Sequence, residues 1–205
     1  MVDEKLIRNK FGDAYSADEH TFKMGIDRRF TIHFAERFRD KIVLESCTGA
    51  GFTTIALAET AKHIFTVEIN PLHQQQAIQN IEKAGLSSKV TFIHGDILDS
   101  KILDGLPNID SAFLDPDWAD TNPNHQYRFL NSRTRPPADQ LFSKISEKTR
   151  NIAIVLPPFI NMHEFEALPE HELERLYFGE NPELFCLYFG TLKNSTDETS
   201  FRITT

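Results

Sequence analysis

Four acidic residues in this sequence each follow a short run of apolar residues. They are Glu45, Glu68, Asp96 and Asp115. The apolar runs have the length and composition of buried strands, and the strands of a parallel sheet end at a common edge. Ligands of such sheets bind beyond the carboxyl ends of the strands. The pattern therefore predicts four carboxylates around one ligand site, a stronger indication than any one acid alone.

A glycine turn follows the first of these acids. Gly49 and Gly51 lie between the strand that ends at Glu45 and a helix-like stretch over residues 52–62. Glycines let the backbone approach a ligand closely, and the N-terminus of the following helix offers unpaired N–H groups to an anion. Glycine pairs are also common in ordinary turns, so this motif alone leaves a plain strand-to-helix connection open.

The position of Glu68 narrows the class of ligand. It follows the glycines by about 20 residues, where dinucleotide-binding folds place an acid that accepts hydrogen bonds from ribose hydroxyls. A nicotinamide-binding motif would carry a third glycine near Thr54, and this chain has none. Glu45, just before the glycine turn, instead suits a ligand with a positive end, such as the amino group of a methionine moiety. This combination resembles the first motifs of class I S-adenosylmethionine-dependent methyltransferases.

The composition is that of an ordinary folded domain. The chain has 205 residues, of which 40% are hydrophobic, and a formal net charge of -8, so contact with nucleic acid would need a local basic patch. The two cysteines and eight histidines show no disulfide framework or metal-ligand spacing, and we expect no metal. No apolar run approaches a membrane span, and the N-terminus is too charged for a secretory signal. We expect a cytoplasmic protein without membrane contact, and no pattern here sets an oligomeric state.

Strands and helices alternate along most of the chain. Residues 1–26 are weakly periodic and are predicted to form an arm packed on a methyltransferase domain of residues 27–205. Predicted strands cover residues 42–44, 63–69, 89–94, 109–114, 152–156, 173–178 and 184–192, and predicted helices cover residues 27–40, 52–62, 71–84 and 138–148. We therefore predict an α/β fold: a Rossmann-like, doubly wound, mostly parallel seven-stranded sheet with an antiparallel C-terminal hairpin.

The tetrapeptide at the end of the fourth predicted strand indicates the reaction. It reads Asp115-Pro116-Asp117-Trp118, and amino methyltransferases carry a related motif of Asn, Asp or Ser, two prolines and an aromatic residue. An exocyclic amine of a base is a poor nucleophile, because its lone pair is delocalised into the ring. A side-chain acceptor and the Pro116 carbonyl can both accept hydrogen bonds from that amine, while Trp118 stacks on the base. The contribution of such a site is positioning and electrostatics.

From about Asp27 to Leu192 the chain resembles the RNA cap guanine-N2 methyltransferase family, that of trimethylguanosine synthase. The resemblance rests on residues 45–51, 67–71, 95–96, 114–118 and the closing strand 187–192. It implies S-adenosylmethionine as cofactor and guanine N2 of RNA as acceptor. The implied cofactor-binding residues are Glu45, Cys47, Gly49, Gly51, Glu68, Ile69, Asp96, Ile97 and Asp115. The implied catalytic residues are Asp115, Pro116 and Trp118, and the implied substrate-binding residues are Asp117, Trp118, Arg128, Arg133 and Arg135.

Two features bear on the acceptor. The family has a second proline where this chain has Asp117, so a charged residue replaces a rigid one beside the reacting amine. In the loop that follows, basic and aromatic residues alternate from His125 to Arg135, as an RNA contact requires. Ordinary solvation of a loop explains such a cluster about equally well. Besides RNA methylation, methylation of a small amine or a protein and a non-catalytic S-adenosylmethionine-binding module stay open. A nicotinamide oxidoreductase is disfavoured.

Overall fold

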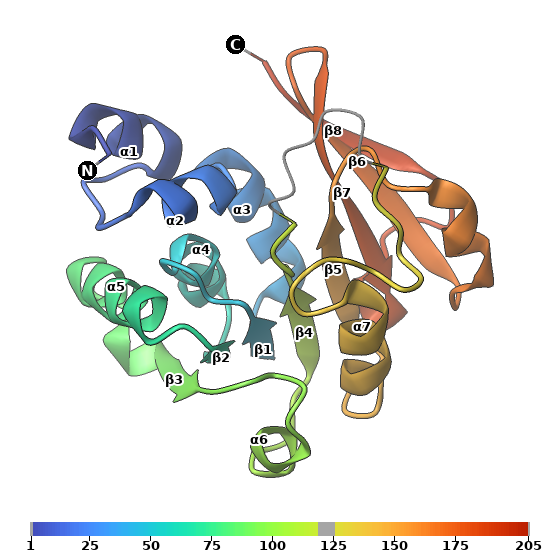
Figure 1. Cartoon of the computed structure of the whole chain (residues 1–205), viewed down its shortest axis with the longest axis horizontal. Coiled ribbons are helices and arrows are strands. Elements are labelled where there is room, and N and C mark those ends of the chain that lie inside the picture. The colour runs from blue at the N-terminus through green and yellow to red at the C-terminus, as the bar shows by residue number, and fades with distance from the viewer. Residues whose placement is uncertain (1, 119–125, 205) are drawn as a thin grey trace. The chain divides into compact units, whose positions relative to one another are not determined.

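The structure, a computed structural model of the 205-residue chain, describes residues 2–118 and 126–204 (Figure 1). The chain divides into two compact units, residues 1–111 and residues 112–205. None of the helices within the described ranges is long and apolar enough to cross a membrane.

Unit 1 consists of three parallel strands with helices between them. Its strands are β1 (Ile42–Ser46), β2 (His63–Glu68) and β3 (Val90–His94). Its helices are α1 (Glu4–Phe11), α2 (Glu19–Met24), α3 (Arg28–Ala35), α4 (Phe52–Thr60), α5 (Pro71–Lys83) and α6 (Ser100–Asp104), with the 3-10 helices η1 (Glu36–Phe38) and η2 (Ser87–Lys89). The strand order is β3-β2-β1, with Ile42 opposite His63 and Ile64 opposite Val90. Because the strands are parallel, β1, β2 and β3 all end at one edge of unit 1.

Local sequence explains where the helices of unit 1 begin. Asn70 caps α5 by accepting a hydrogen bond from the Leu72 N–H at 3.0 Å, and Pro71 occupies the first turn, where its missing N–H costs nothing. Helix α4 starts directly after Gly51, whose φ is 81°. Helix α4 is buried from Phe52 through Ala58, which agrees with a sequence whose apolar residues are not confined to one stripe.

Unit 2 contains the rest of the strands. They are β4 (Ser111–Leu114), β5 (Ile152–Leu156), β6 (His171–Phe178), β7 (Asn181–Phe189) and β8 (Thr199–Ile203), accompanied by α7 (Ala138–Ser146), η3 (Met162–Ala167) and η4 (Gly190–Leu192). Strand β5 is parallel to β4, β7 is antiparallel to both β5 and β6, and β8 is parallel to β6. The closing β6–β7 hairpin is therefore antiparallel, as predicted.

The predicted fold class is confirmed: the chain is α/β and Rossmann-like, with mostly parallel strands and an antiparallel C-terminal pair. The predicted count of seven strands is wrong, because the described ranges contain eight. Strand β8 was missed, since its five residues follow a polar stretch and alternate only weakly. Buried Glu172 holds the first residue of β8 and the segment before it, by accepting hydrogen bonds from the Thr199 hydroxyl at 2.9 Å and the Asn194 N–H at 2.6 Å. These contacts are distant in sequence, so local pattern does not reveal them.

Candidate functional site

Glu68 at the end of β2 organises the glycine turn. One of its carboxylate oxygens accepts a hydrogen bond from the Gly49 N–H at 2.8 Å, and the other accepts one from the Asn70 N–H at 2.8 Å. The residue is 5% exposed. A carboxylate has about four lone-pair positions, so acceptor capacity remains for two hydroxyls of a ribose. The predicted ribose acceptor therefore also connects the turn after β1 to the start of α5.

The glycine turn combines left-handed backbone with open space. The φ angles are 60° at Cys47, 54° at Gly49 and 81° at Gly51. A Cβ at Gly49 would meet nothing within 4 Å, whereas one at Gly51 would lie 3.1 Å from the Ala77 Cβ. Gly51 thus permits close packing on α5, and Gly49 leaves room for a ligand. Cys47 holds a conformation that side-chain-bearing residues rarely adopt, a form of strain that clusters at ligand sites.

Glu45 is buried and bonded to protein hydroxyls. One of its oxygens accepts hydrogen bonds from the Thr54 hydroxyl at 2.6 Å and the Thr66 hydroxyl at 2.7 Å, so the side chain connects β1, α4 and β2. Burial raises the pKa of Glu45 to about 7, and the charge of Glu68 raises it too, against the opposing effect of the two hydroxyls. Its role toward the amino group of a ligand stays a prediction.

Residues after β2 and β3 offer an apolar face and an acceptor. Ile69, directly after Glu68, is 64% exposed, an unusual position for a large aliphatic residue. Exposed Asp96 accepts a hydrogen bond from the Leu98 N–H at 2.9 Å in an Asx turn, and its other oxygen is not used in that turn. Ile97 is buried. Ile69 and Asp96 therefore suit the ring face and the amino group of an adenine.

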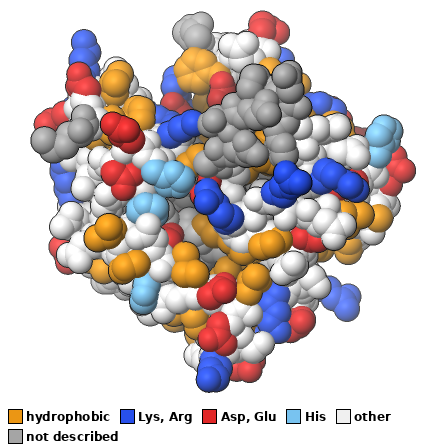
Figure 2. All heavy atoms as spheres, in the orientation of Figure 1, with side chains coloured by type: hydrophobic (Ala, Val, Ile, Leu, Met, Phe, Trp, Pro, Cys, Tyr) orange, Lys and Arg blue, Asp and Glu red, His pale blue; other side chains and the backbone are white. Residues whose placement is uncertain are grey.

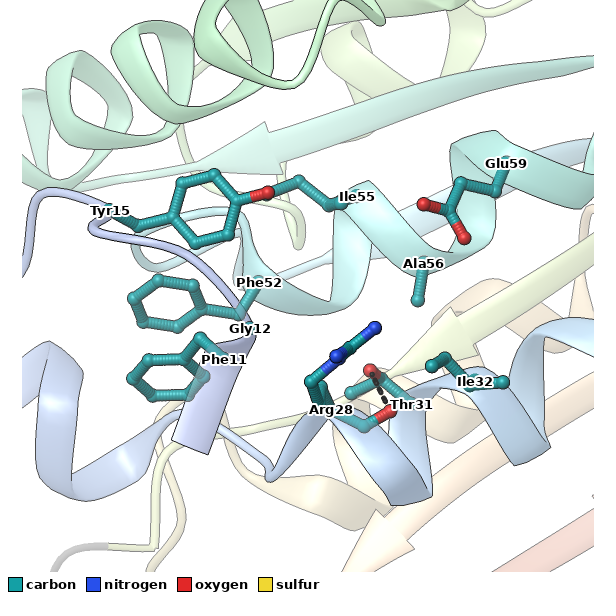
Figure 3. Close-up of a pocket in the computed structure, with 10 residues that line it drawn as sticks. All are labelled: Phe11, Gly12, Tyr15, Arg28, Thr31, Ile32, Phe52, Ile55, Ala56 and Glu59. Carbon is teal, nitrogen blue, oxygen red and sulfur yellow. Dashed lines mark hydrogen bonds between the residues drawn. The ribbon is translucent and has the colours of Figure 1, made fainter. Parts of the chain in front are cut away.

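The N-terminal residues pack on the same turn. Asn80 of α5 is buried, accepts a hydrogen bond from the Ser16 N–H at 2.7 Å, and donates to the carbonyls of Ser16 at 2.9 Å and Ala50 at 2.8 Å. The Phe11 and Phe52 rings lie face to face, with centroids 3.5 Å apart (Figure 3). Helix α1 thus packs on the first residue of α4. Through Asn80, the loop around Ser16 that follows α1 is bonded to the glycine turn.

A small cavity lies between Phe11, Gly12 and Tyr15 near the N-terminus and helices α3 and α4. It measures about 90 Å³, and one face of α4, from Phe52 to Glu59, contributes to its lining (Figure 3). The Arg28 and Glu59 side chains reach it, and both residues are exposed. None of the predicted cofactor-binding residues lines this cavity.

Unit 2 holds the residues predicted to bind the acceptor. Asp115 is half-buried at the end of β4, and Pro116 is buried. Trp118 is half-buried, its carbonyl accepts a hydrogen bond from the Tyr127 hydroxyl, and the two rings meet edge to face with centroids 6.2 Å apart. The Tyr127 carbonyl in turn accepts a hydrogen bond from the Asn161 N–H at 2.9 Å. Trp118 is therefore held through its backbone while part of its ring stays accessible.

The three predicted RNA-binding arginines differ in their partners. Arg128 forms an ion pair with Glu164 at 2.7 Å, and Arg135 forms one with Asp117 at 2.8 Å. Within the described ranges, exposed Arg133 has no ion pair. Basic side chains share the surface with acidic ones on the face drawn in Figure 2. The predicted basic surface is thus partly neutralised by carboxylates, and His125, which was included in it, lies outside the described residues.

Glu164 orders the start of this loop. It accepts hydrogen bonds from the backbone N–H groups of Phe129 at 2.7 Å and Leu130 at 2.8 Å, in addition to its ion pair with Arg128. Burial acts to raise the pKa of Glu164, but these donors and the Arg128 charge together hold that pKa below its usual value. Sequence reasoning missed Glu164, and it missed Asn80 as well. Both bond to segments far away in sequence, and neither occurs in a recognisable motif.

Comparison with solved structures defines the class of fold. A candidate methyltransferase from Porphyromonas gingivalis W83 superposes with a TM-score of 0.75 over 92% of this chain and 48% of that chain, at 17% identity. TrmK of M. capricolum, solved in complex with S-adenosylhomocysteine, has a TM-score of 0.56 over 84% of this chain and 70% of that chain, at 14% identity. The fold is that of the class I methyltransferases.

Sequence comparison defines the family. The model of the RNA cap guanine-N2 methyltransferases matches residues 40–177, and the chain belongs to this family. Trimethylguanosine synthase of Schizosaccharomyces pombe is 29% identical over 158 residues, which are 73% of this chain and 66% of that protein. The chain thus spans just under two thirds of this relative. Across the described residues, no group of three or more His, Cys, Asp and Glu side chains is arranged to hold a metal ion.

The raised pKa of Glu45 predicts a pH dependence of stability. The pKa of Glu45 in the folded protein, about 7, exceeds the usual 4.5. The contribution of protonated Glu45 to the free energy of unfolding is therefore fully present below pH 4.5 and is lost as the pH rises to 7. This loss is about 3 kcal/mol, at 1.36 kcal/mol per pKa unit. Urea unfolding between pH 4.5 and 8 should therefore show the wild type losing stability relative to Glu45→Gln. The control is Glu59→Gln at an exposed position of α4, whose stability should change with pH as that of the wild type does. Parallel profiles of the wild type and Glu45→Gln would contradict the assignment.

Proposed function

We propose that this chain is an S-adenosylmethionine-dependent methyltransferase that acts on guanine N2 of RNA. The observation that carries the cofactor assignment is the open glycine turn, bonded through Gly49 to the carboxylate of Glu68 and followed by exposed Ile69. Family membership supports the same assignment. S-adenosylmethionine, when bound, supplies an electrophilic methyl group on a sulfonium centre.

The residues of unit 1 fit this cofactor. The remaining acceptor capacity of Glu68 suits two ribose hydroxyls, and Ile69 with Asp96 suits the adenine. The glycine turn leaves space where the backbone must approach the ligand. Glu45 titrates near neutral pH, and a cationic amino group nearby would favour its charged form. These residues bind and orient the cofactor.

The residues of unit 2 fit an exocyclic amine. Asp115 and the Pro116 carbonyl accept hydrogen bonds from the amine, and Trp118 provides a flat face for the base. An electron-poor or cationic ring stacks well on indole. The trimethylguanosine synthase relative supports guanine N2 as the acceptor.

A methyltransferase with a small-molecule or protein acceptor is the second candidate. The net charge of -8 and the pairing of Arg128 and Arg135 with carboxylates favour it. A catechol O-methyltransferase of Niastella koreensis is 34% identical over 43% of this chain and 43% of that protein. Incubation with labelled S-adenosylmethionine and separate RNA, protein and metabolite fractions distinguishes the two candidates. Label in 2-methylated guanosine supports RNA, label in another fraction supports the second candidate, and label in none supports a non-catalytic binding module.

Removal of the Glu68 carboxylate tests the cofactor site. Glu68→Ala should weaken S-adenosylhomocysteine binding by about 1.5–3 kcal/mol, the range for hydrogen bonds to a charged group. Calorimetry measures this loss, and Glu82→Ala, at an exposed position of α5, should leave binding unchanged. Tighter binding of a nicotinamide dinucleotide than of S-adenosylhomocysteine by the wild type would overturn the cofactor assignment.

Substitutions in the tetrapeptide test the acceptor site. Asp115→Ala should reduce turnover strongly with little change in S-adenosylmethionine affinity, because it removes an acceptor for the amine. Trp118→Ala should weaken acceptor binding by about 1–3 kcal/mol, the value for base stacking on an aromatic side chain. Trp118→Phe keeps a ring face and should recover part of that loss. Wild-type methylation rates in both alanine variants would show that the acceptor binds elsewhere.

The different partners of the three arginines predict different salt effects. If RNA contacts this loop, Arg133→Ala should lower the slope of log affinity against log salt by about 1. Arg128→Ala and Arg135→Ala should lower it less, because each removes a charge already paired with a carboxylate. Filter binding of a short RNA over a salt series measures the slopes. Arg150→Ala, at an exposed position just before β5, serves as the control. Equal slopes for Arg133→Ala and the wild type would remove the loop from the RNA-binding surface.

A further inference from the structure

We infer that Asp117 is a positioning residue, which fixes Trp118 through a bridge to Arg135. The Asp117–Arg135 bridge consists of three contacts. The Asp117 N–H donates to the Arg135 carbonyl at 3.0 Å, the Arg135 N–H donates to the Asp117 carbonyl at 2.9 Å, and the Arg135 guanidinium donates to the Asp117 carboxylate at 2.8 Å. The consequence for the acceptor rests on the proposed function, whereas the effect on Trp118 does not.

The bridge restrains the backbone directly beside the aromatic residue. Because both the N–H and the carbonyl of Asp117 are bonded, its φ and ψ angles are held from two sides. Pro116, one residue earlier, has its φ limited by its ring. The direction in which the chain enters Trp118 is therefore set by two consecutive restrained residues. A proline in place of Asp117 would also restrain φ, but it has no N–H to donate to the Arg135 carbonyl.

Trp118 has a second, independent restraint on its other side. Its own carbonyl accepts a hydrogen bond from the Tyr127 hydroxyl, and the Tyr127 backbone pairs with Ile160 after β5. The bridge at Asp117 and this contact hold the peptide groups before and after the Trp118 Cα. The indole therefore loses little further conformational entropy when a base stacks on it, and such preorganisation favours binding.

The charged part of the bridge is suited to positioning more than to overall stability. The Arg135 side chain is 72% exposed and that of Asp117 is 23% exposed. Surface ion pairs of this kind add little to the free energy of folding. Variants that remove the pair should therefore fold, and their effects should appear locally at Trp118. The same pairing places the Arg135 guanidinium against Asp117, so Arg135 acts on the acceptor through the bridge.

The single tryptophan of the chain makes the inference measurable without any ligand. Acrylamide quenching of its fluorescence should increase in Asp117→Ala and in Arg135→Ala. The double variant should show no further increase, because both changes remove the same pair. The charge-swapped variant Asp117→Arg, Arg135→Asp should recover part of the protection, and Asp117→Pro should lose it through the missing N–H. The control Arg150→Ala should match the wild type. Wild-type quenching in both single alanine variants, or additive increases in the double variant, would overturn the inference.

Kinetics with a defined probe tests the consequence for the acceptor. With a short RNA capped by 7-methylguanosine, either single variant should raise KM for the RNA about fivefold, equivalent to about 1 kcal/mol. The S-adenosylhomocysteine Kd should stay unchanged, and the charge-swapped variant should recover part of the KM. A merely structural role would lower cofactor affinity as well. If the wild type methylates no RNA, the proposed function fails, while the quenching measurement still decides whether Asp117 positions Trp118.

Discussion

The carboxylate of Glu68 is the interaction on which the candidate cofactor site of unit 1 depends. Its two oxygens bond the Gly49 and Asn70 N–H groups, which lie in the connections after β1 and after β2. Without it, two backbone donors in a partly buried turn would lose their acceptors, at a cost of about 1–3 kcal/mol each. The same group that would bind a ribose thus shapes the backbone around it.

Glu45 and Glu68 lie at the ends of neighbouring strands but have different hydrogen-bond partners. Glu68 is surrounded by N–H donors, which stabilise a carboxylate. Glu45 has hydroxyl partners and is fully enclosed, and burial together with the charge of Glu68 raises its pKa to about 7. One strand end therefore holds a carboxylate that is bonded to two backbone N–H groups, and its neighbour holds a carboxyl group whose pKa is about 7. A ligand that combines hydroxyls with a cationic group matches this division.

Features that depend on neighbouring residues could be predicted from the sequence, and features that depend on distant partners could not. The apolar runs and the Asn70-Pro71 cap located β1, β2 and the start of α5, because local burial and capping determine them. Strand β8 escaped prediction because it depends on pairing with β6. The loop arginines looked like a uniform basic surface in the sequence, since nothing near Arg128 or Arg135 in sequence indicates that Glu164 and Asp117 lie against them.

The hydrogen bonds of Asn80 couple the stability of the segment around Ser16 to that of the glycine turn. The Asn80 side-chain amide bonds both Ser16 and the Ala50 carbonyl. Detachment of the segment around Ser16 would therefore also disturb the hydrogen bond to Ala50 in the turn. By thermodynamic reciprocity, a ligand that orders the turn must tighten the docking of that segment by the same free energy. In a shortened protein that begins at residue 27, the unliganded turn would lack these contacts and the Phe52 ring would be exposed to water. Its cofactor affinity would then differ from that of the whole chain.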